Sequence, residues 1–121
     1  MEMTTKNQSK RFVFSQEVAW EDLGGGIRRQ ILGYDEHLML VRVLFEKGAV
    51  GVVHHHPHRQ TTYVESGVFR VRIGDEEAIL KAGDGFFVPP DVPHGAEALE
   101  AGSLIDVFAP ARRSFLGFDE D

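Results

Sequence analysis

The residues best suited to chemistry lie in one short stretch, GVVHHHPHRQTTYVESG, which contains His54, His55, His56 and His58. Alternate side chains of a β-strand leave the same face, so His54 and His56 would point together and His55 away from them. Neutral imidazole is the commonest protein ligand for metal ions. The spacing therefore indicates a metal site built on His54 and His56. For His55 and His58, we expect a solvated loop or outer-face position.

Two more side chains extend this set of candidate ligands. Pro57 would end the strand, and a short turn then brings Gln60 onto the next strand. His94 lies in the sequence DVPHG, far away along the chain but again beside a strand and a turn. Taken alone, His94 could be a hydrogen-bonded core or edge residue. Beside the first cluster, it becomes the third histidine of a shared metal site.

Strands and turns dominate the sequence that must position these residues. Segment 38–45 is rich in branched side chains, and segment 68–73 alternates apolar residues with arginines, the period of a half-buried strand. Gly74-Asp75 predicts a hairpin leading to a strand over 78–80, and further strands are expected at 86–88 and 103–108. We expect about eight to ten short strands, folded as a small antiparallel jelly-roll barrel with alternate residues pointing inward.

The length and the net charge of the chain limit the number of domains and the kinds of partner that we expect. The 121 residues suit one domain, with a flexible tail over 1–10, a barrel domain over 11–118 and an acidic tail over 119–121. The absence of cysteine excludes thiolate metal sites, and the net charge of -6 argues against nucleic acid as a partner. The start of the chain lacks a signal-peptide pattern, and the run LMLVRVLF is too short to span a membrane. These features predict a cytoplasmic protein without a membrane partner.

Two spaced motifs resemble those of the cupin family. The first is a glycine, H-x-H, an acidic residue and a second glycine, here carried by Gly48, His54, His56, Gln60 and Gly67. The second is a glycine, P-x-G-x-x-H and an asparagine, here carried by Gly83, Pro89, Asp91, His94 and Ala98. The spacings agree, but the sequence departs from the family at Gln60, Asp91 and Ala98, where glutamate, glycine and asparagine are usual. The resemblance implies a jelly-roll β-barrel that binds one divalent metal through His54, His56, Gln60 and His94.

A narrower likeness covers nearly the whole chain beyond the tail. The segments 17–51, 56–71 and 104–115 resemble the small single-domain cupins of pectin and alginate breakdown, the KdgF type. A D-x-F-x-P-x-R pattern typical of that group is present as Asp106, Phe108, Pro110 and Arg112. This resemblance implies metal-dependent linearisation of 4,5-unsaturated uronate monosaccharides.

The predicted ligand set carries its own chemical meaning. Three imidazoles and an amide oxygen are neutral, so a bound M²⁺ would keep its full charge and suit Lewis-acid work on an anionic, oxygen-rich substrate. Oxygen activation commonly uses a carboxylate ligand instead. Glu65 has the opposite strand parity to Gln60 and should face outward. The metal could be nickel, zinc, manganese, iron or cobalt.

Further candidates lie on the last predicted strand. Asp106 and Phe108 share a parity and would point together into the barrel, where Asp106 could act as an acid or base and Phe108 could pack against a sugar ring. Arg112 offers a planar fork for a substrate carboxylate, with Arg113 as its rival for that role. Each residue also has a purely structural alternative. Asp106 could belong to a turn or a salt bridge, Phe108 could be a core residue, and the two arginines could be surface charges.

We therefore expect a metal-dependent sugar isomerase with a small anionic sugar substrate, in which Asp106 and Arg112 act on the substrate. The alternatives are a cupin dioxygenase and a non-catalytic cupin that binds a metal or small molecule. Exposed strand edges favour a homodimer.

Overall fold

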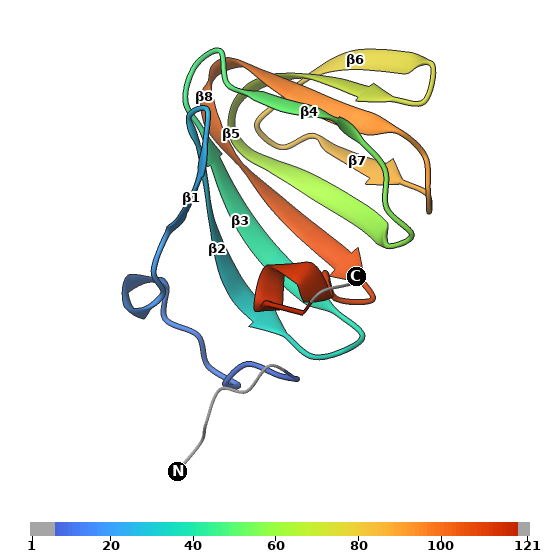
Figure 1. The fold of residues 1–121 in the computed structure, drawn as a ribbon. Coiled ribbons are helices and arrows are strands. Elements are labelled where there is room, and N and C mark those ends of the chain that lie inside the picture. Colours follow the sequence, from blue (N-terminus) through green and yellow to red (C-terminus); the bar gives the residue numbers. More distant parts are fainter. Residues whose placement is uncertain (1–6, 119–121) are drawn as a thin grey trace.

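Eight antiparallel strands and two short 3₁₀ turns form the fold (Figure 1), and the computed structural model describes residues 7–118. The elements are η1 (Ser15–Glu17), β1 (Glu21–Gly24), β2 (Ile27–Tyr34), β3 (Met39–Phe45), β4 (Val50–His54), β5 (Arg59–Ile73), β6 (Glu76–Lys81), β7 (Gly85–Val88), β8 (His94–Ala109) and η2 (Arg113–Leu116). The all-β jelly-roll prediction is confirmed. Segments 68–73 and 103–108 were predicted as separate strands, and they are the second halves of the long strands β5 and β8.

The two long strands join two layers of sheet. The first half of β5 pairs with β7 and with the second half of β8, which also pairs with β3; β2 and β1 follow outward. The second half of β5 pairs with β6, and the first half of β8 pairs with β4. Figure 1 shows the layers facing one another, with β4 opposite β2 and β3. Side chains from both inner faces can therefore meet in one cavity.

The strands β5 and β8 cross from one layer to the other at glycine residues. Gly67 has a φ of 85°, and a Cβ there would lie 2.7 Å from the backbone oxygen of Ala101. Gly102, which faces it on β8, likewise has no room for a side chain. The register of β5 against β8 shifts around Ser66 and Val68 at this point. Because a bulge exchanges the two faces of a strand, even-numbered residues point inward before Gly67 and odd-numbered residues after it.

The core fills one end of the space between the layers. Phe69 is fully buried and its ring meets that of Phe45 edge-on, with the centroids 5.2 Å apart. A second buried cluster surrounds Met39, Val41 and Phe108. Between these clusters lies a cavity of about 190 Å³. Its size suits a small ligand, since pockets for drug-sized molecules are several hundred Å³.

Part of the predicted N-terminal tail lies against the barrel. The Ser9 amide donates to the Tyr34 carbonyl at 2.9 Å, and the Tyr34 amide donates to Ser9 Oγ at 3.1 Å. The remaining predicted tail residues 1–6, and the acidic tail 119–121, lie outside the described residues. Residues 7–118 include no helix long and apolar enough to cross a membrane.

Candidate metal centre

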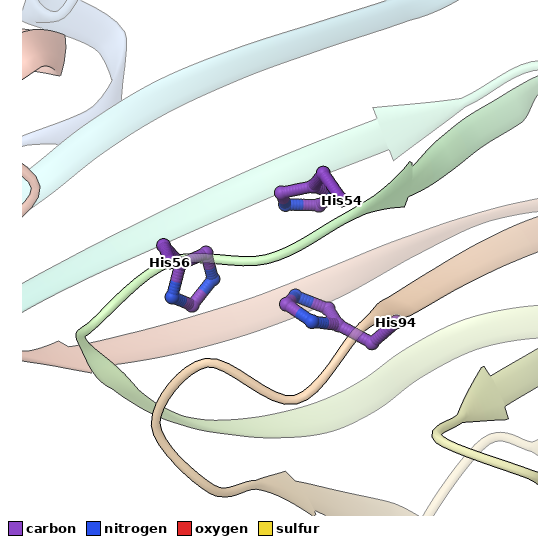
Figure 2. A group of neighbouring side chains, drawn as sticks. All are labelled: His54, His56 and His94. Atoms are coloured by element: carbon purple, nitrogen blue, oxygen red, sulfur yellow. The ribbon is translucent and has the colours of Figure 1, made fainter.

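Three histidines converge at the open end of the barrel. Each of His54, His56 and His94 offers one ring nitrogen, and these nitrogens all lie within 4.8 Å of one another. Figure 2 shows the rings turned toward a common point, His54 from the end of β4, His94 from the start of β8, and His56 from the loop after β4. The ring centroids of His54 and His94 are 4.5 Å apart, and those of His56 and His94 are 4.8 Å apart. This group could hold a metal ion.

Backbone carbonyls fix the protonation of all three rings. The Nδ1 atoms of His54, His56 and His94 lie 2.9, 3.1 and 2.9 Å from the carbonyl oxygens of Val52, His58 and Val92, respectively. A carbonyl oxygen only accepts, so each Nδ1 donates and each Nε2 is left with a lone pair. His94 Nε2 is buried without a hydrogen-bond partner in the described part of the chain. Three fixed lone pairs, one of them buried and unsatisfied, are what a cation requires.

Gln60 adds a fourth lone pair. Its Nε2 donates to Thr62 Oγ1 at 3.0 Å and to Asp106 Oδ1 at 3.3 Å, which turns Oε1 toward His56. Gln60 Oε1 and His56 Nε2 are 3.1 Å apart. With the His56 proton on Nδ1, both atoms of this contact are acceptors. A cation between them removes that conflict, so the donor set fits a metal.

Strand register and one unusual turn place the histidines. His54 pairs directly with His94 at the β4–β8 boundary. The predicted strand through His56 is shorter than expected, since β4 ends at His54, yet His56 still points to the same side. The amide of Asp91 donates to the His56 carbonyl at 2.8 Å, and Asp91 has a φ of 63°. Aspartate tolerates this left-handed conformation better than most residues, which explains how it replaces the usual glycine.

The other two histidines of the cluster differ from each other. His55 is exposed, as predicted, and its Nδ1 lies 3.8 Å from an Asp91 carboxylate oxygen. His58 lies in the loop but is fully buried, so the expectation of a solvated residue is wrong. Its ring centroid is 5.3 Å from that of His56, and its carbonyl accepts from His56 Nδ1. His58 therefore packs against the candidate ligand His56 and fixes its ring.

The electrostatics favour neutral imidazoles. Burial, together with the nearby charges of Arg112 and His94, lowers the pKa of His56 to about 4. Burial also lowers the pKa of His94. A histidine must be neutral to bind a metal, so both rings keep their binding form at neutral pH.

A carboxylate lies next to these groups in the cavity. Asp106 Oδ1 accepts from Thr62 Oγ1 at 2.6 Å and from Gln60. Burial raises the pKa of Asp106 to about 6, although the bonds from Thr62 and Gln60 and the charge of Arg112 oppose this rise. The sheet register explains the grouping, because Thr62 is paired with Asp106 and Gln60 with Phe108. The predicted inward orientation of Asp106 and Phe108 is confirmed.

The structure separates the two candidate arginines. Arg112 lines the cavity, with Cζ 5.3 Å from the centre of the Phe108 ring. Arg113 is exposed and its Cζ lies 4.2 Å from the centre of the Phe118 ring. Glu65 faces outward as expected, where it accepts from Ser103 at 2.6 Å and from Arg42 at 3.1 Å. Of the two arginines predicted for this role, Arg112 is therefore the one that lines the cavity.

Sequence reasoning missed three residues of this site: Thr62, which donates to Asp106, and Arg29 and Phe115, which line the cavity. Thr62 could have been found, since it lies two residues after Gln60 on the same strand face. Arg29 on β2 and Phe115 on η2 both line the cavity, but neither belongs to a local motif. Their positions follow from how β2 and the C-terminal turn close over the barrel.

Comparison with known proteins adds independent evidence. The family model described as "Cupin domain" matches residues 41–108. The pectin degradation protein KdgF of Dickeya dadantii is 45% identical over 109 residues, covering 88% of this chain and 99% of that protein. The structure of KdgF from a Halomonas species is 40% identical with a TM-score of 0.83, covering 88% of this chain and 99% of that one. An RmlC-like cupin from Shewanella frigidimarina is 49% identical with a TM-score of 0.88, covering 90% and 98%.

Proposed function

This chain belongs to the cupin family, and we propose that it is a pectin-degradation cupin that linearises 4,5-unsaturated uronate monosaccharides. The likeness to two KdgF proteins over most of both chains supports this choice. One observation carries it: the Asp106 carboxylate is held by Gln60 and Thr62 in a small cavity, directly beside three converging imidazoles. That arrangement places a proton carrier next to a Lewis-acid site.

The proposed reaction is an isomerisation and needs no co-reactant. The substrate is a cyclic hemiacetal whose ring oxygen is also part of an enol ether. The bond between the anomeric carbon and the ring oxygen breaks, and the anomeric hydroxyl loses its proton to become an aldehyde. The ring oxygen is left as an enolate, which collapses to a ketone when the neighbouring alkene carbon, C4, takes up a proton. One proton leaves oxygen and one arrives at carbon, so the atoms balance.

The metal residues prepare the cavity for an oxygen-rich ligand. A divalent transition ion, such as nickel, zinc, manganese, iron or cobalt, would be held by His54, His56, Gln60 and His94 and would supply Lewis-acid stabilisation of developing negative charge. The backbone carbonyls orient the imidazoles, and Thr62 and Asp106 orient the Gln60 amide. All four ligands are neutral, which leaves the charge of the ion undiminished for an anionic sugar.

Asp106 is the residue that moves protons in this proposal. Its pKa of about 6 lies close to neutrality, so both its charged and its protonated forms are accessible there. The carboxylate takes the proton from the anomeric hydroxyl and, as a carboxylic acid, delivers it to C4. The Thr62 hydroxyl holds one carboxylate oxygen at 2.6 Å and limits its rotation.

Arg112 and Phe108 bind the rest of the sugar. The Arg112 guanidinium pairs with the uronate carboxylate, for which its planar fork is suited. Phe108 is 3% exposed, and its ring centroid lies 5.8 Å from that of His56, so it forms a floor beside the metal ligands. The cavity of about 190 Å³ favours a monosaccharide over a longer chain.

The test follows the ultraviolet absorbance of a 4,5-unsaturated galacturonate, which disappears when the conjugated double bond is lost. Metal-loaded protein should remove the absorbance faster than the spontaneous reaction does. Asp106→Asn should slow this removal by roughly a hundredfold or more while metal content stays unchanged. A rate equal to the spontaneous one in the loaded protein would reject the function.

The same preparations separate the alternative functions. Oxygen uptake with an aromatic diol would favour a dioxygenase. Tight binding of the sugar without turnover would favour a non-catalytic binding protein.

A further inference from the structure

A second guanidinium lines the cavity on the side away from β4. Arg29 points inward from β2, where its partner on β3 is Val43, and its side chain is only 13% exposed. An arginine among apolar inward residues is unusual, because an unpaired buried charge is costly. Its position therefore calls for a specific partner.

One partner is Glu21 on the neighbouring edge strand. The two residues are in register across β1 and β2, and the carboxylate accepts from Arg29 Nε at 2.9 Å and from Nη2 at 3.2 Å. This bidentate pair uses one edge of the guanidinium and fixes its plane. Among residues 7–118, Glu21 is the only group to which Arg29 donates a hydrogen bond, and Nη1 is not engaged by it. Both N–H groups of Nη1 are therefore left for a ligand.

Phe115 brings this guanidinium together with Arg112. The Cζ atoms of Arg29 and Arg112 lie 3.6 and 4.6 Å from the centre of the same Phe115 ring. The negative ring faces stabilise both cations and hold them in place. Two like charges on one ring beside a cavity repel each other, and an anion bound between them would relieve that repulsion.

We propose that Arg29 is a second substrate-binding residue, whose Nη1 donates to the carboxylate that Arg112 also binds, and that Glu21 is its positioning residue. The identity of the ligand as a uronate rests on the proposed function. The recognition of a sugar carboxylate by this pair is independent of turnover. In this arrangement the β1–β2 edge and η2 together form a carboxylate-binding wall, defined by Arg29, Arg112 and Phe115.

A purely structural role makes a different prediction. If the Arg29–Glu21 pair only ties β1 to β2, removing it lowers stability without changing which sugars bind. Discrimination between a charged and a neutral sugar of the same shape therefore separates the two roles.

The experiment measures binding of D-galacturonate and D-galactose by calorimetry, in EDTA-treated and in metal-loaded protein. The variants are Arg29→Met, Arg29→Lys and Glu21→Gln, and the matched control is Arg113→Met, which removes the same charge from an exposed site on Phe118. Arg29→Lys keeps a cation beside Glu21 and guards against a folding defect in Arg29→Met. Thermal denaturation of each variant is recorded alongside.

The parent should bind galacturonate at least about tenfold more tightly than galactose, as expected when a charge-assisted hydrogen bond is made. Arg29→Met should lose most of that preference, Arg29→Lys and Glu21→Gln part of it, and Arg113→Met none. The proposal is overturned if the parent shows no preference, or if the folded Arg29 variants keep the parent's preference. Binding is measured with saturated sugars, so a failure of the ultraviolet assay would leave this result intact.

Discussion

Replacing Gln60 by glutamate tests why this barrel carries an amide at that position. The Gln60 Nε2 atom lies 3.3 Å from Asp106 Oδ1 and 3.0 Å from Thr62 Oγ1. In Gln60→Glu an oxygen takes the place of that nitrogen. A donor to Asp106 becomes an acceptor, and a second negative charge lies against a carboxylate that is already buried. We expect the variant to be less stable without metal.

The geometry sets the size of this effect. Two unit charges 3.3 Å apart repel by about 5 kcal/mol at an effective dielectric constant of about 20. Uptake of one proton limits the loss. At pH 7 this uptake costs about 4 kcal/mol for a carboxyl group with an ordinary pKa of about 4.3, and about 1 kcal/mol for Asp106, whose pKa burial raises to about 6. We therefore expect the free energy of unfolding to fall by about 1–4 kcal/mol at pH 7. At pH 5 the same protonation costs about 1 kcal/mol or less.

The sign of the pH dependence of this stability loss follows from the proton that the two neighbouring carboxyl groups share. The pair in the folded variant has a raised pKa, so its stability is retained at low pH and is lost as the pH rises from about 5 to 7. Urea denaturation of EDTA-treated protein at the two pH values measures this difference. The control Gln16→Glu makes the same chemical change in the exposed η1 turn and should show neither effect.

A double-mutant cycle isolates the repulsion. Adding Asp106→Asn to Gln60→Glu should restore most of the stability lost at pH 7, and a divalent metal should stabilise Gln60→Glu more than the parent. The electrostatic reasoning would be refuted if Gln60→Glu were as stable as the parent at pH 7. It would also be refuted if the variant lost the same free energy of unfolding at pH 5 and at pH 7.

Two further predictions concern the ligands and the outer face. His94→Ala should lose bound metal to below about a tenth of the parent's content by elemental analysis, whereas His55→Ala should keep it, because His55 is exposed and outside the converging group. Glu65→Gln should cost less than about 1 kcal/mol at pH 7, because the carboxylate accepts from Ser103 but is exposed, so solvent screens the interaction. The same hydrogen bond lowers the pKa of Glu65 below its ordinary 4.5. A group with a lowered pKa contributes stability that is present above pH 4.5 and is lost as the pH falls. The difference between parent and variant in urea denaturation should therefore shrink in acid. A difference that stays constant with pH would contradict this prediction.

The grouping of the converging histidines could be predicted from the sequence because their spacing matches strand geometry. His54 and His56 are two residues apart, and the structure brings both to the side where His94 lies. The parity of Asp106 and Phe108 also predicted their inward orientation, because a strand without a bulge keeps its alternation. Gln60 stood out as an amide where glutamate is usual, and its contact with Asp106 gives that difference a physical reason.

The remaining site residues depend on the tertiary structure. Arg29 lines the cavity from β2, and Phe115 lines it from η2, which follows β8. The choice between Arg112 and Arg113 depends on where η2 begins, which strand periodicity does not specify. His58 was expected in solvent because polar loops are usually exposed, but its ring packs beside His56.

The most direct test of the central claim, that Asp106 delivers a proton to C4, is proton NMR of a 4,5-unsaturated galacturonate in D₂O with metal-loaded protein. With the parent protein we expect rapid opening with one deuterium placed on a single face of C4. With Asp106→Asn we expect slow opening with deuterium on both faces. Deuterium on both faces with the parent protein, or decay no faster than the spontaneous reaction, would contradict it.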